Sequence, residues 1–200
     1  MGVAGSSERL VHLSGITPAL GPSCRALVLH LAALAAAAGK PVSYDLNYRA
    51  TLTNPADARA ALEGAVPHLH LLVLAERDAQ NVLGFAQAGE DLATAIAARY
   101  AVPLVALTRP PDAEPGTLLL ARGEFRYAPR LEVEVVDRIG AGDSFVAGLI
   151  HGLLDGDVDL AIRLAGFAAA IGLATPGDIN YLGLEDIARF HANRLGGLER

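Results

Sequence analysis

One segment of the sequence combines small residues and carboxylates in an order that could bind and transfer a phosphoryl group. It reads Asp137-Arg138-Ile139-Gly140-Ala141-Gly142-Asp143-Ser144-Phe145 and runs into an apolar stretch. Small side chains at 140–142 would let backbone N–H groups at a helix start come close to an anion. The Asp143 carboxylate would repel a bound phosphate unless its task is to take a proton from an attacking hydroxyl. A base beside an anion site indicates phosphoryl transfer.

The same residues allow two other interpretations. Asp143 could cap a helix after the glycine-rich turn, and residue types alone do not decide between a cap and a base. Gly142-Asp143-Ser144 also resembles the serine block of GDS-type esterases, in which Ser144 would be the nucleophile. The acid and base of such an esterase would have to be Asp186 and His191, whose spacing does not match. The serine esterase therefore stays a distant alternative.

Two common nucleotide motifs do not occur in this sequence. A P-loop needs the pattern GxxxxGK[ST], but Lys40 is the single lysine and does not stand in it. Gly140-x-Gly142 lacks the third glycine of the dinucleotide fingerprint and stands late in the chain. A phosphate site here must therefore depend on backbone amides and arginine.

Composition excludes several classes of partner. The 16 basic and 22 acidic residues of the 200 give a net charge of −6, and no basic tract could follow a nucleic-acid backbone. Cys24 is the only cysteine, which excludes a disulfide framework and favours a reducing compartment. The longest apolar stretch, Leu27–Ala38, contains His30 and is too short to span a bilayer. We therefore expect a cytoplasmic protein with a small-molecule substrate, no nucleic acid and no membrane association.

Apolar runs alternate with helical segments along the chain, which predicts an α/β domain with a parallel sheet covered on both faces. Strands are expected at 10–13, 41–44, 68–74 and 102–107. Helices are expected at 21–38, from Pro55 after the cap Asn54, and at 76–83, 89–100, 142–154, 158–175 and 184–194. Residues 117–121 and 124–127, joined at Arg122-Gly123, predict a β-hairpin. No repeat or linker divides the chain, so we expect one α/β domain over residues 1–200.

Polar residues stand at the predicted carboxyl ends of the strands, where ligands bind in such sheets. They are Ser14-Gly15, Asp45-Asn47-Arg49, Glu76-Asp78 and Thr108-Arg109.

Four segments together resemble a known family. Asp137–Phe145 is similar to the C-terminal signature of the ribokinase-like (PfkB) carbohydrate kinases. Three further segments narrow the resemblance to 2-keto-3-deoxygluconate kinases: Ser14-Gly15-Ile16-Thr17, Tyr44-Asp45-Leu46-Asn47-Tyr48-Arg49 and Pro176-Gly177-Asp178-Ile179-Asn180. The order and spacing of all four match, so the resemblance covers nearly the whole chain. It implies a ribokinase-like, Rossmann-like fold with a mostly parallel sheet flanked by helices.

The resemblance also implies a role for each matching residue. Asp143 would be the catalytic base, and the amides of Gly140, Ala141 and Gly142 would form the anion hole. The implied substrate-binding residues are Arg49, Asp178, Ile16 and Gly15; the implied nucleotide-binding residues are Thr108, Arg109, Gly140, Gly142 and Phe167; and Asp78 would lie near Mg²⁺. An arginine at a strand end can bind a carboxylate or a phosphate with two hydrogen bonds, although Arg49 could also form a surface ion pair. ATP and Mg²⁺ are the implied cofactors.

The chain departs from the family pattern at several positions. Ala75 replaces the asparagine of the family's Asn-x-x-Glu, and Asp78 replaces its glutamate. Leu107-Thr108-Arg109-Pro110 stands where the family has a glycine-containing turn, and Phe167 stands where asparagine is frequent near the adenine. Arg138 and Ile139 replace threonines, which leaves a monovalent-cation site open.

Similar kinases have a further segment before the strand that ends in Ser14-Gly15. It holds the first sheet strand, a glycine pair that contacts the sugar, and a β-lid, so the sequence as given looks like the nucleotide-binding and catalytic portion without them. We expect ATP-dependent phosphorylation of a sugar acid, 2-keto-3-deoxygluconate to its 6-phosphate by resemblance. The alternative is a catalytically silent fragment that retains nucleotide binding. An exposed sheet edge would favour self-association, so a homo-oligomer is expected.

Overall fold

The computed structural model describes residues 8–195, and of His191 and residues 193–195 only the backbone. The described chain forms two compact units. The first contains residues 8–113 and 118–125, and the second contains residues 114–117 and 126–195. That these two units fold together as the predicted single α/β domain stays a prediction.

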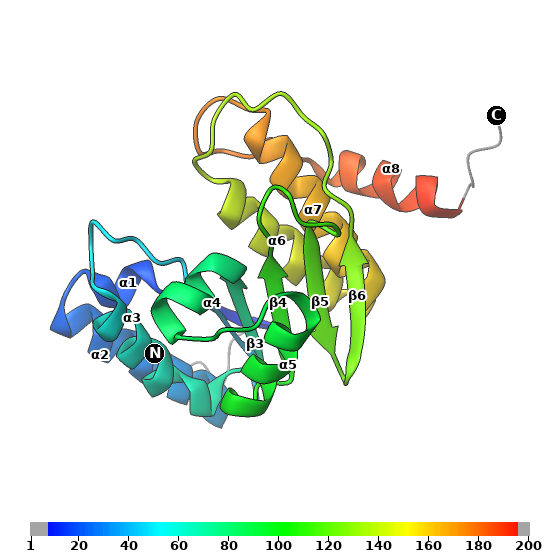
Figure 1. Ribbon diagram of the computed structural model, residues 1–200. Helices are drawn as coiled ribbons and strands as arrows, with labels where there is room; N and C mark the ends of the chain where they lie inside the picture. The colour runs from blue at the N-terminus through cyan, green and yellow to red at the C-terminus, as the bar shows by residue number, and fades with distance from the viewer. Residues whose placement is uncertain (1–7, 196–200) are drawn as a thin grey trace. The chain divides into compact units, whose positions relative to one another are not determined.

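The first unit is built on a six-stranded sheet in the order β1-β2-β3-β4-β5-β6, of which Figure 1 labels β3 to β6. Its strands are β1 (Val11–Ser14), β2 (Val42–Asp45), β3 (Leu71–Ala75), β4 (Leu104–Thr108), β5 (Thr117–Ala121) and β6 (Glu124–Ala128), the last of which continues into the second unit. Strands β1 to β4 pair in parallel, which confirms the predicted parallel sheet. Ser14 pairs with Asp45, and Ala75 pairs with Thr108, so the predicted polar strand ends lie along one edge.

The connections between the parallel strands are helical. They are α1 (Ile16–Ala19), α2 (Pro22–Ala37), α3 (Pro55–Ala65), the 3₁₀ turn η2 (Val66–His68), α4 (Glu76–Leu83) and α5 (Gly89–Tyr100). Side chains from α2, α3, α4 and α5 share one apolar core with alternate residues of the strands, among them Tyr44 and Leu72. Intervening strand residues such as Leu71 and Val73 are buried as well, as expected for strands covered on both faces.

Local signals explain several helix ends. The Asn54 side chain accepts a hydrogen bond from the Asp57 N–H at 3.0 Å, and Pro55 occupies the first helical position, as predicted. Gly84 ends α4 with a φ of 77°, a left-handed conformation that glycine adopts without strain.

The hairpin β5–β6 turns at Arg122-Gly123, as predicted. Both residues have positive φ, 54° and 81°, which is the two-residue turn that matches the twist of paired strands.

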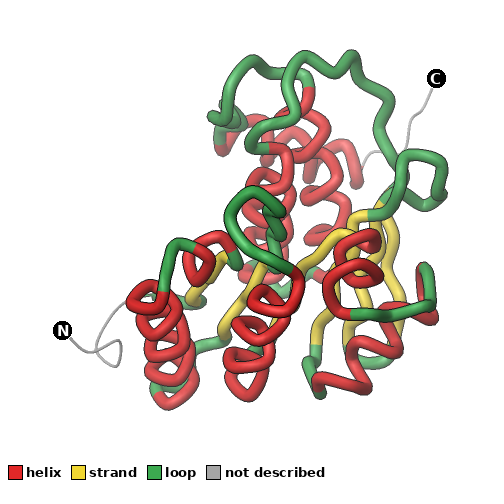
Figure 2. The backbone as a smooth tube through the Cα atoms, turned by 60° about the vertical axis from the view of Figure 1, so that its left-hand side comes forward, coloured by secondary structure: helices red, strands yellow, loops and turns green. Residues whose placement is uncertain are grey.

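The second unit contains three helices, α6 (Ala141–Leu154), α7 (Val158–Leu173) and α8 (Leu184–Leu195). Glycines let α6 and α7 pack closely, because a Cβ at Gly148 would come within 2.7 Å of the Leu164 carbonyl oxygen. The segment 129–140, between β6 and α6, is loop throughout (Figure 2). None of the helices in the described part of the chain is both long and apolar enough to cross a membrane.

Two differences between the predicted and the observed local structure have a clear physical reason. The third strand was expected from His68, but His68 lies in the 3₁₀ turn η2, and β3 begins at Leu71. Pro67 explains the difference, because its ring fixes φ and it lacks the N–H that a strand would use. The short helix α1 was not predicted, since its four residues are too few to show helical periodicity.

Candidate active site

In the first unit, the loops after β1 and β2 lie against each other at Gly15. The Gly15 N–H donates to the Asp45 carbonyl oxygen at 2.8 Å. A Cβ at this position would overlap the Leu46 carbonyl oxygen and lie 2.9 Å from its carbon. Only glycine allows this approach, so the residue predicted to bind substrate is also required by backbone packing.

The loop that carries Arg49 is fixed by a polar network at Asn47. The Asp45 carboxylate accepts the Asn47 N–H at 3.1 Å, and the Asn47 amide donates to the Ser14 hydroxyl at 3.4 Å. That hydroxyl also accepts the Ile16 N–H at 3.4 Å. Ser14 and Asn47 thus join the start of α1 to the loop of Arg49, and the Arg49 side chain is left exposed.

Glu76, at the start of α4, is a buried carboxylate with two partners. It accepts the Arg109 Nε–H at 3.2 Å and the Gly89 N–H at 3.1 Å. The Glu76 side chain is 6% exposed and that of Arg109 is 16% exposed. This pair holds the end of β3, the end of β4 and the start of α5 together. It also engages the Nε–H of Arg109, which the sequence predicted to bind nucleotide.

Asp78 follows on the first turn of α4 and is 9% exposed. Burial raises its pKa, while the positive charges of Arg77, at 3.5 Å, and of Arg49 lower it in part. Arg49 thus acts on Asp78 through its charge. Thr108 ends the neighbouring strand β4, beside Ala75.

In the second unit, α6 begins at the predicted anion site. Gly140 precedes the helix with a φ of 76° and provides no side-chain cap. The first N–H groups of a helix have no partner within it, so those of Ala141, Gly142 and Asp143 are directed out of the helix start. Gly142 and Asp143 are exposed. Of the residues that the sequence assigned to an anion hole and a base, Ala141, Gly142 and Asp143 therefore share the first turn of α6, and Gly140 directly precedes it.

The Pro176–Asn180 loop packs on that helix start. A Cβ at Gly140 would lie 2.7 Å from the Asp178 carbonyl oxygen and 3.0 Å from its Cα. Asp137 joins the same contact, accepting the Gly177 N–H at 3.2 Å and the Ile139 N–H at 3.0 Å. These hydrogen bonds lower the pKa of Asp137, and the one from Ile139 has the largest effect. Asp178, predicted to bind substrate, is thus fixed beside the anion site through its backbone.

Phe167 lies on α7 and stacks on Phe190 of α8, with ring centroids 4.8 Å apart. Both rings line a hollow of about 120 Å³ together with Pro129, Leu131 and Arg163. One face of Phe167 is covered by the chain itself, so its role beside an adenine stays a prediction.

One carboxylate of the first unit is suited to bind magnesium. No group of three or more metal-binding side chains occurs within residues 8–195 as far as they are described. Mg²⁺ commonly takes one or two carboxylates and completes its shell with water and substrate phosphates. Asp78 is such a carboxylate, with Arg77 3.5 Å away, whereas the more buried Glu76 is engaged by both Arg109 and Gly89.

Comparison with known proteins gives the family. The model for "pfkB family carbohydrate kinase" matches residues 5–183. The chain belongs to this family. A 2-dehydro-3-deoxygalactonokinase of Haloferax volcanii is 34% identical over 190 residues, which are 94% of this chain and 59% of the relative. A fructokinase of Klebsiella pneumoniae is 32% identical over 174 residues, which are 82% of this chain and 54% of the relative.

Solved structures agree with this assignment. The 2-dehydro-3-deoxygluconokinase of Thermotoga maritima superposes with a TM-score of 0.81 at 29% identity, covering 92% of this chain and 60% of that one. The ribokinase-like fold predicted from the motifs is therefore confirmed. This pfkB chain spans about three fifths of the length of these relatives.

Membership of the pfkB family removes the serine esterase from consideration, and the structure gives a physical reason. Ser144 is 7% exposed, and its hydroxyl faces Gly172 of α7, where a Cβ would lie 3.0 Å from it. Ser144 is therefore buried between α6 and α7 and is not presented on an exposed turn, as a serine nucleophile would be.

Sequence reasoning missed two residues that shape the site. Glu76 was noted at a strand end without a role, although a carboxylate before a helix and an arginine after the next strand could have suggested the pair. Asn180 was quoted only as part of a motif. Its amide donates to the Ala168 carbonyl oxygen at 2.8 Å and fixes the Pro176–Asn180 loop to α7. No local signal in the sequence identifies that partner.

Proposed function

We propose that this pfkB chain provides the catalytic machinery for ATP-dependent phosphorylation of a 2-keto-3-deoxy sugar acid at a primary hydroxyl. The observation that carries the proposal is the start of α6, where Gly142 and Asp143 are exposed and the first backbone N–H groups have no partner within the helix. The relatives named 2-dehydro-3-deoxygalactonokinase and 2-dehydro-3-deoxygluconokinase support the substrate class. ATP is the proposed phosphoryl donor.

Each residue then has a task in the proposed reaction. Asp143 accepts the proton of the attacking hydroxyl, and the amides of the helix start stabilise negative charge on the moving phosphoryl group. Arg49 binds the sugar carboxylate, and Asp178 accepts hydrogen bonds from sugar hydroxyls. Bound Mg²⁺ supplies charge neutralisation at the phosphates, and Asp78 is the residue that would hold it.

Substitution of Asp143 tests the base. Asp143→Asn should lower turnover by about 10²–10⁴-fold and change ATP affinity little, because the amide cannot accept the proton. Asp91→Asn is the matched control, since Asp91 is an exposed aspartate at the same third position of a helix, α5. Coupled ADP-release assays measure turnover, and calorimetry measures ATP binding.

Three results decide the proposal. Turnover that falls in Asp143→Asn and not in Asp91→Asn supports it. Equal turnover in the two variants contradicts the role of Asp143. A parent chain that binds ATP without any turnover favours the alternative, a silent fragment that only binds nucleotide. This alternative is considered because the chain covers 59% and 60% of two of its relatives.

Arg49 tests the substrate class. Arg49→Ala should raise KM for 2-keto-3-deoxygluconate or 2-keto-3-deoxygalactonate at least about tenfold, roughly the value of one charged hydrogen bond. Fructose lacks the carboxylate and serves as the control substrate. Equal losses on acids and on fructose would place Arg49 on the phosphates instead. Cytoplasmic location, self-association and a monovalent-cation requirement stay predictions from the sequence.

A further inference from the structure

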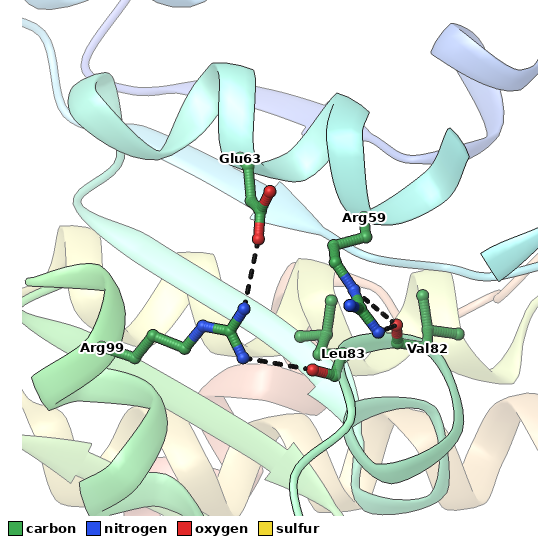
Figure 3. A network of polar contacts seen from close by, with 5 residues as sticks. All are labelled: Arg59, Glu63, Val82, Leu83 and Arg99. Carbon is green, nitrogen blue, oxygen red and sulfur yellow. Dashed lines mark hydrogen bonds and ion pairs between the residues drawn. The ribbon is translucent and has the colours of Figure 1, made fainter. Parts of the chain in front are cut away.

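Helix α4 carries Asp78 on its first turn and is only eight residues long. Two turns of helix are not stable by themselves in water, so the position of this carboxylate must be imposed by other parts of the first unit. The start of α4 is held through Glu76, which binds Arg109 and Gly89. Its other end is held by arginines from two neighbouring helices, as Figure 3 shows.

Two carbonyl oxygens at the end of α4 accept these arginines. Arg59 of α3 donates through both Nε, at 2.9 Å, and Nη2 to the Val82 carbonyl. Arg99 of α5 donates through Nη1 to the Leu83 carbonyl at 3.2 Å. The last four carbonyls of a helix have no partner within it. A positive charge at this end also interacts favourably with the negative end of the helix dipole. The arginines therefore bind α4 where it lacks its own hydrogen bonds.

The guanidinium of Arg99 is itself fixed in place. Its Nη2 lies 3.3 Å from the Glu63 carboxylate of α3. Its central carbon lies 5.3 Å from the centroid of the Phe85 ring and 5.2 Å from that of Tyr100, within the range of cation–π attraction. The Arg99 side chain is 43% exposed, and its ion pair and two aromatic neighbours together favour the position in which it binds the carbonyl. Helices α3, α4 and α5 are thus locked at one point.

The position of Asp78 depends on these contacts at the end of α4. The residue lies on the first turn of the helix and is only 9% exposed, so a small displacement of α4 would move its carboxylate away from the position in which it can meet a ligand. Fixing both ends of the helix keeps the charged group where a divalent cation can use it.

We infer that Arg59 and Arg99 are positioning residues for magnesium-dependent nucleotide binding, acting through α4 on Asp78. The inference rests on the proposed function, since it takes Asp78 as the magnesium carboxylate. The inference requires no contact of either arginine with nucleotide or metal. Their effect is expected in the part of nucleotide affinity that depends on Mg²⁺.

Calorimetric binding of ADP, with saturating Mg²⁺ and with a chelator, separates this effect from general loosening. In Arg59→Met and Arg99→Met the enhancement of ADP affinity by Mg²⁺ should fall about tenfold or more, the usual size of such indirect effects at metal sites. Affinity without Mg²⁺ should stay within about twofold of the parent. Arg189→Met removes an exposed arginine of α8 whose partner Glu185 is 3.8 Å away, and it should match the parent.

Lysine variants keep the test decisive if a methionine variant fails to fold. Arg59→Lys and Arg99→Lys retain a cationic donor for the carbonyl and should restore part of the Mg²⁺ enhancement. Folded variants with the parent's enhancement would overturn the inference, and so would equal losses with and without Mg²⁺, which mean a structural role only. A parent that binds ADP without any Mg²⁺ enhancement overturns the inference, whereas a parent that binds no ADP overturns the proposed function with it.

Discussion

Replacing Gly140 by alanine should damage the anion site far more than the same change two residues later. Gly140 has a φ of 76°, and a Cβ there would lie 2.7 Å from the Asp178 carbonyl oxygen. Gly142 lies inside α6, and a Cβ there would meet no atom of another segment within 4 Å. Both changes add one methyl group at the start of α6, so the difference between them isolates the effects of conformation and contact.

The magnitude follows from two terms. Alanine in a left-handed conformation costs about 1–2 kcal/mol. Overlap with a backbone that must shift costs about 1–3 kcal/mol more. Gly140→Ala should therefore lower the free energy of unfolding by about 2–5 kcal/mol, and the melting temperature by roughly 4–20 °C for a chain of this size. Gly142→Ala should raise the free energy of unfolding by about 0.5–1 kcal/mol, because alanine favours the helix.

Urea and thermal unfolding followed by far-UV circular dichroism measure both variants. The sequence has no tryptophan, so the helical signal is the suitable probe. Calorimetry with ATP adds a functional readout, because a displaced Asp178 loop also displaces the first turn of α6. Gly140→Ala within about 1 kcal/mol of the parent, or equal losses in the two variants, would refute the argument that the Pro176–Asn180 loop depends on this contact.

Two further substitutions test buried polar groups in the first unit. Because burial raises the pKa of Asp78 above its ordinary value of 3.8, Asp78→Asn should stabilise the chain at neutral pH. In urea titrations this gain in stability should vanish as pH falls through the raised pKa to below 3.8, because Asp78 is then protonated in folded and unfolded chains alike. The Asp78→Asn variant should also lose the Mg²⁺ enhancement of ADP binding, because it lacks the carboxylate. The Tyr100 hydroxyl is buried without a hydrogen-bond partner among the described residues, so Tyr100→Phe should raise the free energy of unfolding by about 1 kcal/mol. Destabilisation by Tyr100→Phe would reveal a hydrogen bond to that hydroxyl.

The sequence by itself determined the elements whose signals are local. The bounds of α4 and α5 agree with prediction at both ends, because Gly84, Gly89 and the apolar spacing act within a few residues. Arg122-Gly123 specified the hairpin in the same way. The alternation of apolar runs with helices determined the parallel sheet, and the Asp137–Phe145 segment pointed to the family that the comparisons confirm.

Only the tertiary structure decided which side chains meet. Glu76 and Arg109 are 33 residues apart in sequence, and Arg59 is 23 residues from the carbonyl that it binds. Asp137 reaches the backbone of Gly177 across 40 residues, beside the contact that requires glycine at position 140. Such pairs depend on which strands are neighbours and how closely helices approach. A residue's type fixes what it can bind, but burial and distance, which fix its partner and the pKa of Asp78, arise only when separate elements pack.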